Sequence, residues 1–90
     1  HEAVRLTVHG RVQGVGFRFF VRERAKKFGL TGWVRNRPEG SVEIHAEGDH
    51  DMLEHFTEII RNGPIFSHVS TLEVEKMTPT NKYNSFNIAF

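Results

Sequence analysis

The chain has 90 residues, of which 38% are hydrophobic, with eight phenylalanines, no cysteine and a formal net charge of +1. This composition predicts one apolar core and a single domain over residues 1–90, and it excludes disulfides and thiolate chemistry. The sequence contains no long apolar run, so we expect a cytoplasmic protein without a membrane segment, in agreement with the lack of cysteine.

The first half of the chain predicts a strand, a helix and a second strand. Apolar and polar residues alternate over residues 3–9, which is typical of a strand with one buried face. A helix is expected over Phe17–Phe28, because its apolar residues recur at helical spacing and Gly29 suits the position after its last turn. The run Thr31–Asn36 predicts the second strand.

The second half predicts a similar set of elements. After a turn at Pro38–Gly40, alternation predicts a strand over Ser41–Glu47. An amphipathic helix begins near residues 49–51 and ends at Gly63-Pro64, and another strand lies within residues 67–76. A final short strand is expected to place three apolar residues on one face, namely Phe86, Ile88 and Phe90.

The predicted order is β-α-β-β-α-β followed by a short C-terminal strand. Strands with one polar face indicate a mainly antiparallel sheet, and two amphipathic helices can cover its apolar face. The simplest such architecture is the ferredoxin-like split βαβ sandwich, an α+β fold. In this arrangement Glu43, His45 and Glu47 are expected on the outer, polar face. Because this fold supports many activities, it does not by itself determine the function.

The glycine-rich segment Gly10–Arg18 (GRVQGVGFR) is the strongest candidate binding site. A turn from strand to helix can direct several backbone N–H groups at an anion, and Arg18 lies where its guanidinium can bind the same anion. Residues 1–40 carry a net charge of +6 and residues 41–90 a net charge of −5, so this half also attracts anions. The segment lacks the Walker A and dinucleotide-binding patterns, and on these residues alone an ordinary turn stays an alternative.

The remaining residues offer no obvious general acid, nucleophile or metal site. The histidines form no metal-binding spacing and are expected at the surface, at positions 9, 45, 50, 55 and 68. The acidic residues are expected to be solubilising charges. Taken alone, Asn36 is typical of a turn and Trp33 of a packing residue.

Two ordered motifs together resemble both signatures of the acylphosphatase family. The first is Gly10–Arg18, and the second is Gly32-Trp33-Val34-Arg35-Asn36-x-x-x-Gly40-x-Val42 followed by Gly48. Gly63-Pro64 and the ending Tyr83-x-x-Phe86-x-Ile88 are also similar to the family. The resemblance therefore covers nearly the whole chain.

The resemblance implies a metal-independent hydrolase that cleaves acyl phosphates into a carboxylate and inorganic phosphate. By match of motif, Arg18 would bind the phosphate and Asn36 would position the attacking water. The loop would bind phosphate oxygens through its backbone amides, from Gln13, Gly14, Val15, Gly16, Phe17 and Arg18. The implied partners are small acyl phosphates, with inorganic phosphate as product and competitive inhibitor. We further expect a monomer without cofactor, nucleic-acid or membrane partner.

Two functions of other classes stay open from the sequence. One is a non-catalytic module of the same fold, which senses a ligand or forms the acylphosphatase-like part of a larger hydrogenase-maturation protein. The other is a nucleic-acid-binding domain that uses the basic half of the chain. The predicted outer strand faces lack the aromatic platform that stacks bases, which argues against this second function.

Overall fold

Two helices and five strands follow one another in the order that the sequence predicts. The computed structural model describes residues 1–90. Its elements are β1 (Glu2–Arg11), α1 (Phe17–Lys27), β2 (Thr31–Asn36), β3 (Val42–Gly48), α2 (His50–Asn62), β4 (His68–Met77) and β5 (Phe86–Ile88). Each predicted element is present, and the ends differ by at most two residues from those expected. Neither helix is long and apolar enough to cross a membrane.

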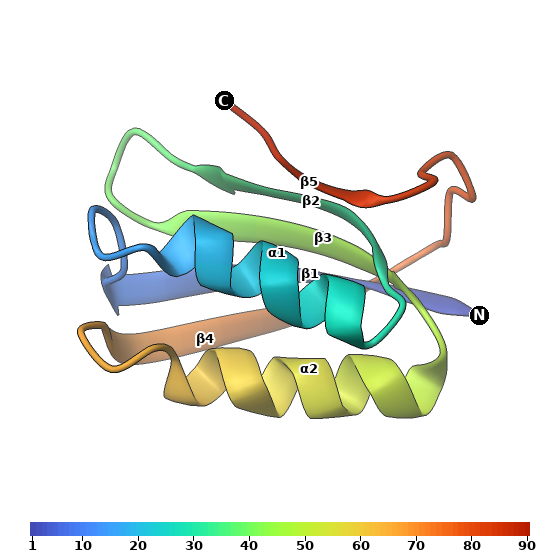
Figure 1. Cartoon of the computed structure of the whole chain (residues 1–90), viewed down its shortest axis with the longest axis horizontal. Helices are drawn as coiled ribbons and strands as arrows, with labels where there is room; N and C mark the ends of the chain where they lie inside the picture. Colours follow the sequence, from blue (N-terminus) through green and yellow to red (C-terminus); the bar gives the residue numbers. More distant parts are fainter.

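The strands form one sheet in the order β4-β1-β3-β2-β5 (Figure 1). β3 lies between β1 and β2 and pairs with both in the antiparallel direction, and β4 pairs antiparallel with the other edge of β1. This is the split βαβ arrangement of the ferredoxin-like α+β fold, as predicted. The short β5 adds a parallel edge beside β2, with Ile88 opposite Val34.

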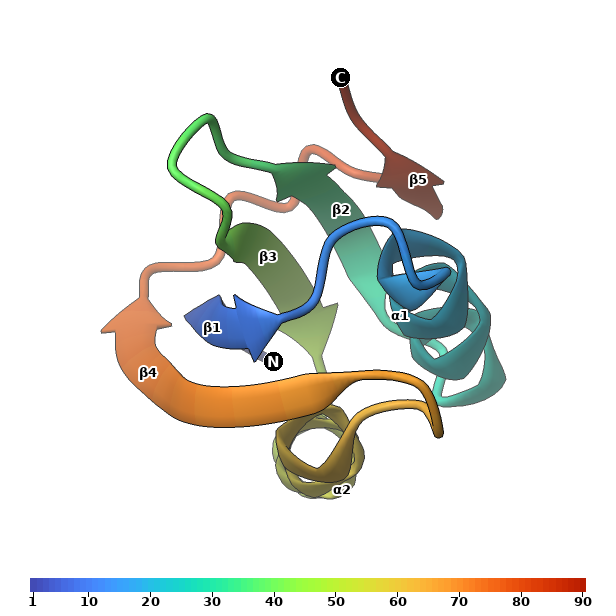
Figure 2. The ribbon, with the colours of Figure 1, turned by 90° about the vertical axis from the view of Figure 1, so that its left-hand side faces the viewer.

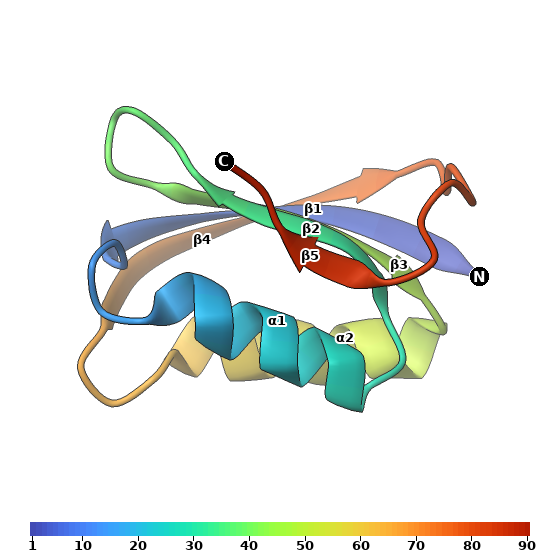
Figure 3. The ribbon, with the colours of Figure 1, turned by 45° about the horizontal axis from the view of Figure 1, so that its top comes forward.

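Both helices cover the same face of the sheet (Figure 3). Each buries residues at helical spacing, in α1 Phe17, Val21 and Ala25 and in α2 Leu53, Phe56 and Ile60. They pack on the inward-facing apolar residues of the strands, which include Leu6, Val34 and Ile44. The alternation in the sequence therefore identified the core face correctly.

The opposite face of the sheet differs from the expectation. Glu43, His45 and Glu47 are expected in solvent, but their exposed fractions are only 5%, 3% and 1%. β3 is the central strand, so long side chains of its neighbour β2 cover it. The guanidinium of Arg35 lies 2.7 Å from the carboxylate of Glu43, and the ring of Trp33 stacks on His45 with the centroids 5.9 Å apart. The prediction of a surface histidine is thus wrong for His45, and that of solubilising acids is wrong for Glu43 and Glu47.

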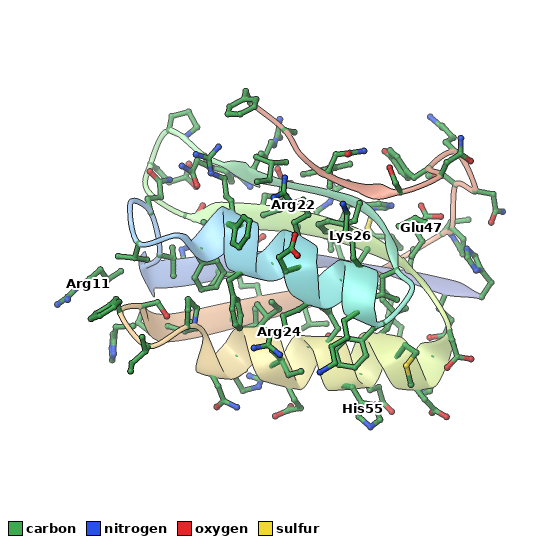
Figure 4. The ribbon with its side chains drawn as sticks, viewed as in Figure 1. Arg11, Arg22, Arg24, Lys26, Glu47 and His55 are labelled. Carbon is green, nitrogen blue, oxygen red and sulfur yellow. The ribbon has the colours of Figure 1, made fainter.

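Glu47 attaches the segment between β4 and β5 to the sheet. Its buried carboxylate accepts hydrogen bonds from the backbone N–H groups of Thr80 and Asn81, each at 3.0 Å, and from the Thr80 hydroxyl at 2.8 Å. The Nε2 atom of His45 lies 2.7 Å from the same carboxylate. Figure 4 shows Glu47 beside this connecting segment, which leads directly into β5. The network therefore helps to place the edge strand.

This network makes stability depend on pH. Burial alone would raise the pKa of Glu47, but the hydrogen bonds from His45, Thr80 and Asn81 outweigh it and lower the pKa from 4.5 to about 2. A carboxylate with a lowered folded-state pKa stabilises the protein above its unfolded-state pKa, and this contribution is lost as the pH falls through the folded-state value. We therefore expect Glu47→Gln to lower the free energy of unfolding at neutral pH by about 3 kcal/mol.

The difference between wild type and Glu47→Gln should shrink as the pH falls from 4.5 toward 2. Urea unfolding of both proteins at neutral pH and at several acidic pH values measures this difference. The comparison cancels the titration of groups far from residue 47, because their contribution is the same in both proteins. A difference that does not change with pH would contradict the assignment.

Candidate active site

The loop between β1 and α1 leaves the start of α1 without a cap. Gly16 is the N-cap residue and has left-handed backbone angles, with φ of 76° and ψ of 17°, which glycine adopts at least cost. No side chain accepts a hydrogen bond from the first turn, and this turn contains no acidic residue. The first helical bond runs from the N–H of Phe20 to the carbonyl of Gly16. The N–H groups of the residues between them are therefore free to bind an anion.

The start of α2, in contrast, is capped by a side chain of the protein. Asp49 precedes α2, and its carboxylate accepts hydrogen bonds from the backbone N–H groups of Asp51 and Met52. That carboxylate satisfies the helix donors from within the chain. α1 lacks such a group, so its N-terminus keeps both its donors and its positive partial charge.

Arg18 lies in the first turn of α1, beside these donors. Its guanidinium carbon is 5.3 Å from the centroid of the Phe90 ring, and it forms no ion pair with a carboxylate of the chain. Two other arginines nearby are paired: Arg22 contacts Glu23 at 3.3 Å, and Arg37 contacts Glu39 at 3.2 Å. Arg18 is thus a cation without a counter-ion next to an uncapped helix end.

Asn36 lies at the end of β2, close to the loop. Its Oδ1 atom is buried and accepts no hydrogen bond from the protein. A buried acceptor without a partner costs roughly 1–3 kcal/mol, so such an atom is informative about function. The amide can accept a hydrogen bond through Oδ1 and donate through Nδ2, which suits the orientation of a water molecule.

A cavity of about 220 Å³ brings these groups together. It is lined by Val12, Gly14, Gly16, Phe17, Arg18, Phe19, Asn36, Ile88 and Phe90. Figure 2 looks onto this end of the molecule, where the β1–α1 loop, the end of β2 and the C-terminus lie near one another. None of the lining residues is Asp, Glu, His or Lys, so the cavity holds a cation and amide groups but no general acid or base.

Two other cavities of about 330 Å³ are larger but lack this combination. One lies between α2 and the edge formed by β1 and β4, and the other on the outer side of α1. Size alone therefore does not identify the site. The smaller cavity is the candidate because free donors, an unpaired cation and an unpartnered amide converge on it.

The side chain of Gln13 connects the two halves of the site. Its Nε2 donates to the backbone carbonyls of Arg37 at 2.8 Å and Ser41 at 2.9 Å. These residues close the turn between β2 and β3, because the N–H of Arg37 also donates to the carbonyl of Ser41. The glycine loop and the end of the strand that carries Asn36 are therefore held in a fixed relation.

The cavity brings some of the predicted site residues together and not others. Gly14, Gly16, Phe17, Arg18 and Asn36 line it, whereas Gln13 and Val15 do not. Sequence reasoning missed four lining residues, which are Val12, Phe19, Ile88 and Phe90. Phe90 was expected on the apolar face of the last strand, but it lies beyond β5 and is fully exposed. The only sequence signal at Phe90 is its two-residue spacing from Ile88. This spacing fits a buried strand position and does not indicate a place at the cavity.

The structure groups one set of potential metal ligands away from this cavity. His50, Asp51 and Glu54 lie on the exposed side of α2 with ligand atoms within 4.8 Å of one another. The two ring nitrogens of His50 already contact Glu2 at 2.9 Å and Glu54 at 3.2 Å. The hydrogen bond to Glu2 raises the pKa of His50, which favours the protonated ring over a metal-binding one. We assign no metal to this group.

Comparison with known proteins finds one family that matches over nearly the whole chain. The chain matches the acylphosphatase family over residues 4–88. It is 49% identical to the acylphosphatase of Bacillus licheniformis over 86 residues, which is 96% of each chain. The crystal structure of acylphosphatase from Bacillus subtilis matches with a TM-score of 0.96 and 43% identity over all of both chains. The structure of an acylphosphatase from Coxiella burnetii matches with a TM-score of 0.93 and 38% identity, over 98% of this chain and 92% of that chain. A full-length HypF structure matches over only 12% of its length, with a TM-score of 0.88 and 30% identity.

Proposed function

Because this chain belongs to the acylphosphatase family, we propose that it hydrolyses the carboxyl–phosphate bond of acyl phosphates, releasing a carboxylate and inorganic phosphate. The observation that carries the proposal is the convergence of Arg18, the uncapped start of α1 and Asn36 on one cavity. Arg18 and the start of α1 are suited to bind the phosphate of the substrate, and Asn36 is suited to bind the attacking water.

In the proposed complex, the phosphate binds at the start of α1. The free N–H groups of the loop Gln13–Arg18 and of the first turn donate to phosphate oxygens, and the guanidinium of Arg18 donates two parallel hydrogen bonds. Phosphoryl transfer places charge on these oxygens in the transition state. Donors held in position before the reaction lower the barrier, and removing one typically costs about 10²–10³ in rate.

Asn36 holds the attacking water. Protein encloses Oδ1 in the free state, so we propose that the amide turns toward the cavity when substrate binds. Oδ1 then accepts a hydrogen bond from the water, which leaves an oxygen lone pair directed at phosphorus. The water oxygen forms a bond to phosphorus while the bond from phosphorus to the acyl oxygen breaks, and the electron pair leaves with the carboxylate. The proton of the water passes to a phosphate oxygen, because no lining residue is a suitable base.

The substrate explains why so few groups are sufficient. The leaving group is a carboxylate whose conjugate acid has a pKa of about 4, as for Asp and Glu. It departs at neutral pH without protonation by a general acid and without stabilisation by a metal. We therefore propose a metal-independent reaction, and we propose that the protein acts as a monomer.

Benzoyl phosphate hydrolysis in the presence of EDTA tests the function. We expect turnover with benzoate and phosphate as products, and competitive inhibition by added inorganic phosphate. Folded protein that binds phosphate without turnover would instead support a ligand-binding module. Activity that disappears in EDTA and returns with a divalent metal would contradict the metal-independent mechanism.

A further inference from the structure

We propose that Phe19, Ile88 and Phe90 form a subsite for the acyl group, which makes the protein selective for acyl phosphates with aromatic or large apolar acyl groups. This inference rests on the proposed function and extends it to the substrate class. The three side chains line the same cavity as Arg18 and Asn36. They have no hydrogen-bonding group, so they can contact only the acyl part of the substrate.

The apolar lining residues are of two kinds. Val12 and Phe17 are 1% exposed and belong to the core, and Ile88 packs against it, so the fold accounts for the presence of these three in the lining. Phe19 and Phe90 are 56% and 104% exposed, respectively, and the core does not require them. Large exposed apolar side chains around a polar site are typical of ligand contact.

The position of Phe90 relative to Arg18 brings this surface close to the reacting bond. The Phe90 ring lies 5.3 Å from the guanidinium carbon of Arg18. When Arg18 holds the phosphate, the acyl carbon is separated from phosphorus by a single bridging oxygen. The substituent on that carbon therefore begins within reach of the ring. An aromatic substituent can pack on Phe90 or Phe19, whereas the methyl group of acetyl phosphate is too small to cover either ring.

The backbone supports this geometry through β5. Ile88 is paired with Val34 in β2, and the N–H of Ala89 donates to the carbonyl of Val34 at 2.8 Å. β2 ends two residues later, at Asn36. Since β2 and β5 are parallel, the end of β2 and the C-terminus lie at the same end of the sheet (Figure 1). The edge strand thus carries Phe90 to the cavity.

The test compares kcat/KM for benzoyl phosphate and acetyl phosphate in the wild type, in Phe90→Ala and in Phe66→Ala. Both substrates release carboxylates whose conjugate acids have similar pKa values. The ratio of kcat/KM for benzoyl phosphate to kcat/KM for acetyl phosphate therefore reports the contact between the protein and the acyl group. We expect Phe90→Ala to lower this ratio about tenfold, the effect of losing one apolar contact in a specificity pocket. Phe66 is the matched control: it is 75% exposed but does not line the cavity, so its removal should leave the ratio unchanged.

Different failures lead to different conclusions. If Phe90→Ala lowers kcat/KM equally for both substrates, Phe90 acts only through its contact with Arg18. This result would refute the acyl subsite but not the proposed hydrolase function. An unchanged ratio with unchanged constants also refutes the subsite. If the folded wild type hydrolyses neither substrate, the proposed function itself fails, and the acyl subsite fails with it.

Discussion

Replacing Arg18 by Lys is expected to lower kcat/KM for benzoyl phosphate about 1000-fold, although the positive charge is kept. A guanidinium is planar and donates two parallel hydrogen bonds to a phosphate, whereas an ammonium is a point charge on a flexible stem. The cavity contains no other cation to compensate. The loss should therefore appear in kcat as well as in the affinity for inorganic phosphate, because the contact strengthens as charge develops on the transferring group.

The matched control for Arg18→Lys is Arg24→Lys. Arg24 lies further along α1 (Figure 4). Like Arg18, it lies over an aromatic ring, with its guanidinium carbon 5.1 Å from the centroid of Phe20, but neither Arg24 nor Phe20 lines the cavity. This control should keep full activity. Because Arg18 forms no ion pair, its replacement should change the free energy of unfolding by less than about 0.5 kcal/mol, which urea unfolding can verify. An active Arg18→Lys protein would show that a positive charge alone is sufficient and would exclude the two-point contact.

The order and type of the elements could be predicted because the apolar residues recur at strand or helix spacing and the glycines lie at the ends of elements. Apolar alternation identified the inner face of the strands, and Gly29 and Gly63 fell at the helix ends as expected. The direction of β5 could not be predicted, since three residues carry no signal that distinguishes a parallel from an antiparallel edge. Pairing partners depend on the whole sheet, and local pattern does not contain them.

The buried outer face of β3 shows a second limit of pattern reading. Alternation distinguishes an apolar side from a polar side, but it does not tell whether the polar side faces water. Glu43 is covered by arginines from neighbouring strands, and Glu47 by a segment more than 30 residues later in the sequence. Charged residues can be buried in this way because each has partners, which only the tertiary structure reveals.

Some features of the candidate site could be predicted from local sequence, and others depend on contacts between distant residues. The glycine loop could be singled out as a candidate anion site from local sequence, because a strand–helix turn and Arg18 are adjacent in the chain, but an ordinary turn stayed an alternative. Asn36 lies on another element and looked like a turn residue until the family resemblance singled it out. Its role stays a prediction, as does that of Arg18. Gln13 was expected to contribute a backbone amide, but its side chain joins the two parts of the site, which no spacing in the sequence indicates.

Asn36→Ala should separate catalysis from binding. We expect kcat for benzoyl phosphate to fall by roughly 100- to 1000-fold, because no other lining side chain can accept a hydrogen bond from the water. The inhibition constant of inorganic phosphate should change by less than about twofold, since the amides of the loop and Arg18 are intact. Asn62→Ala, at the exposed end of α2, is the matched control and should be fully active.

Stability gives an independent readout for Asn36. Its Oδ1 is a buried acceptor that the protein does not satisfy, so a purely structural role would leave this cost unexplained. If the residue is retained for the water, Asn36→Ala removes the cost together with the activity, and the free energy of unfolding should stay equal or rise. A marked loss of stability, with loss of phosphate binding, would show that Asn36 shapes the loop instead. In that case the water would be held by backbone groups, and the proposed role of the amide would be wrong.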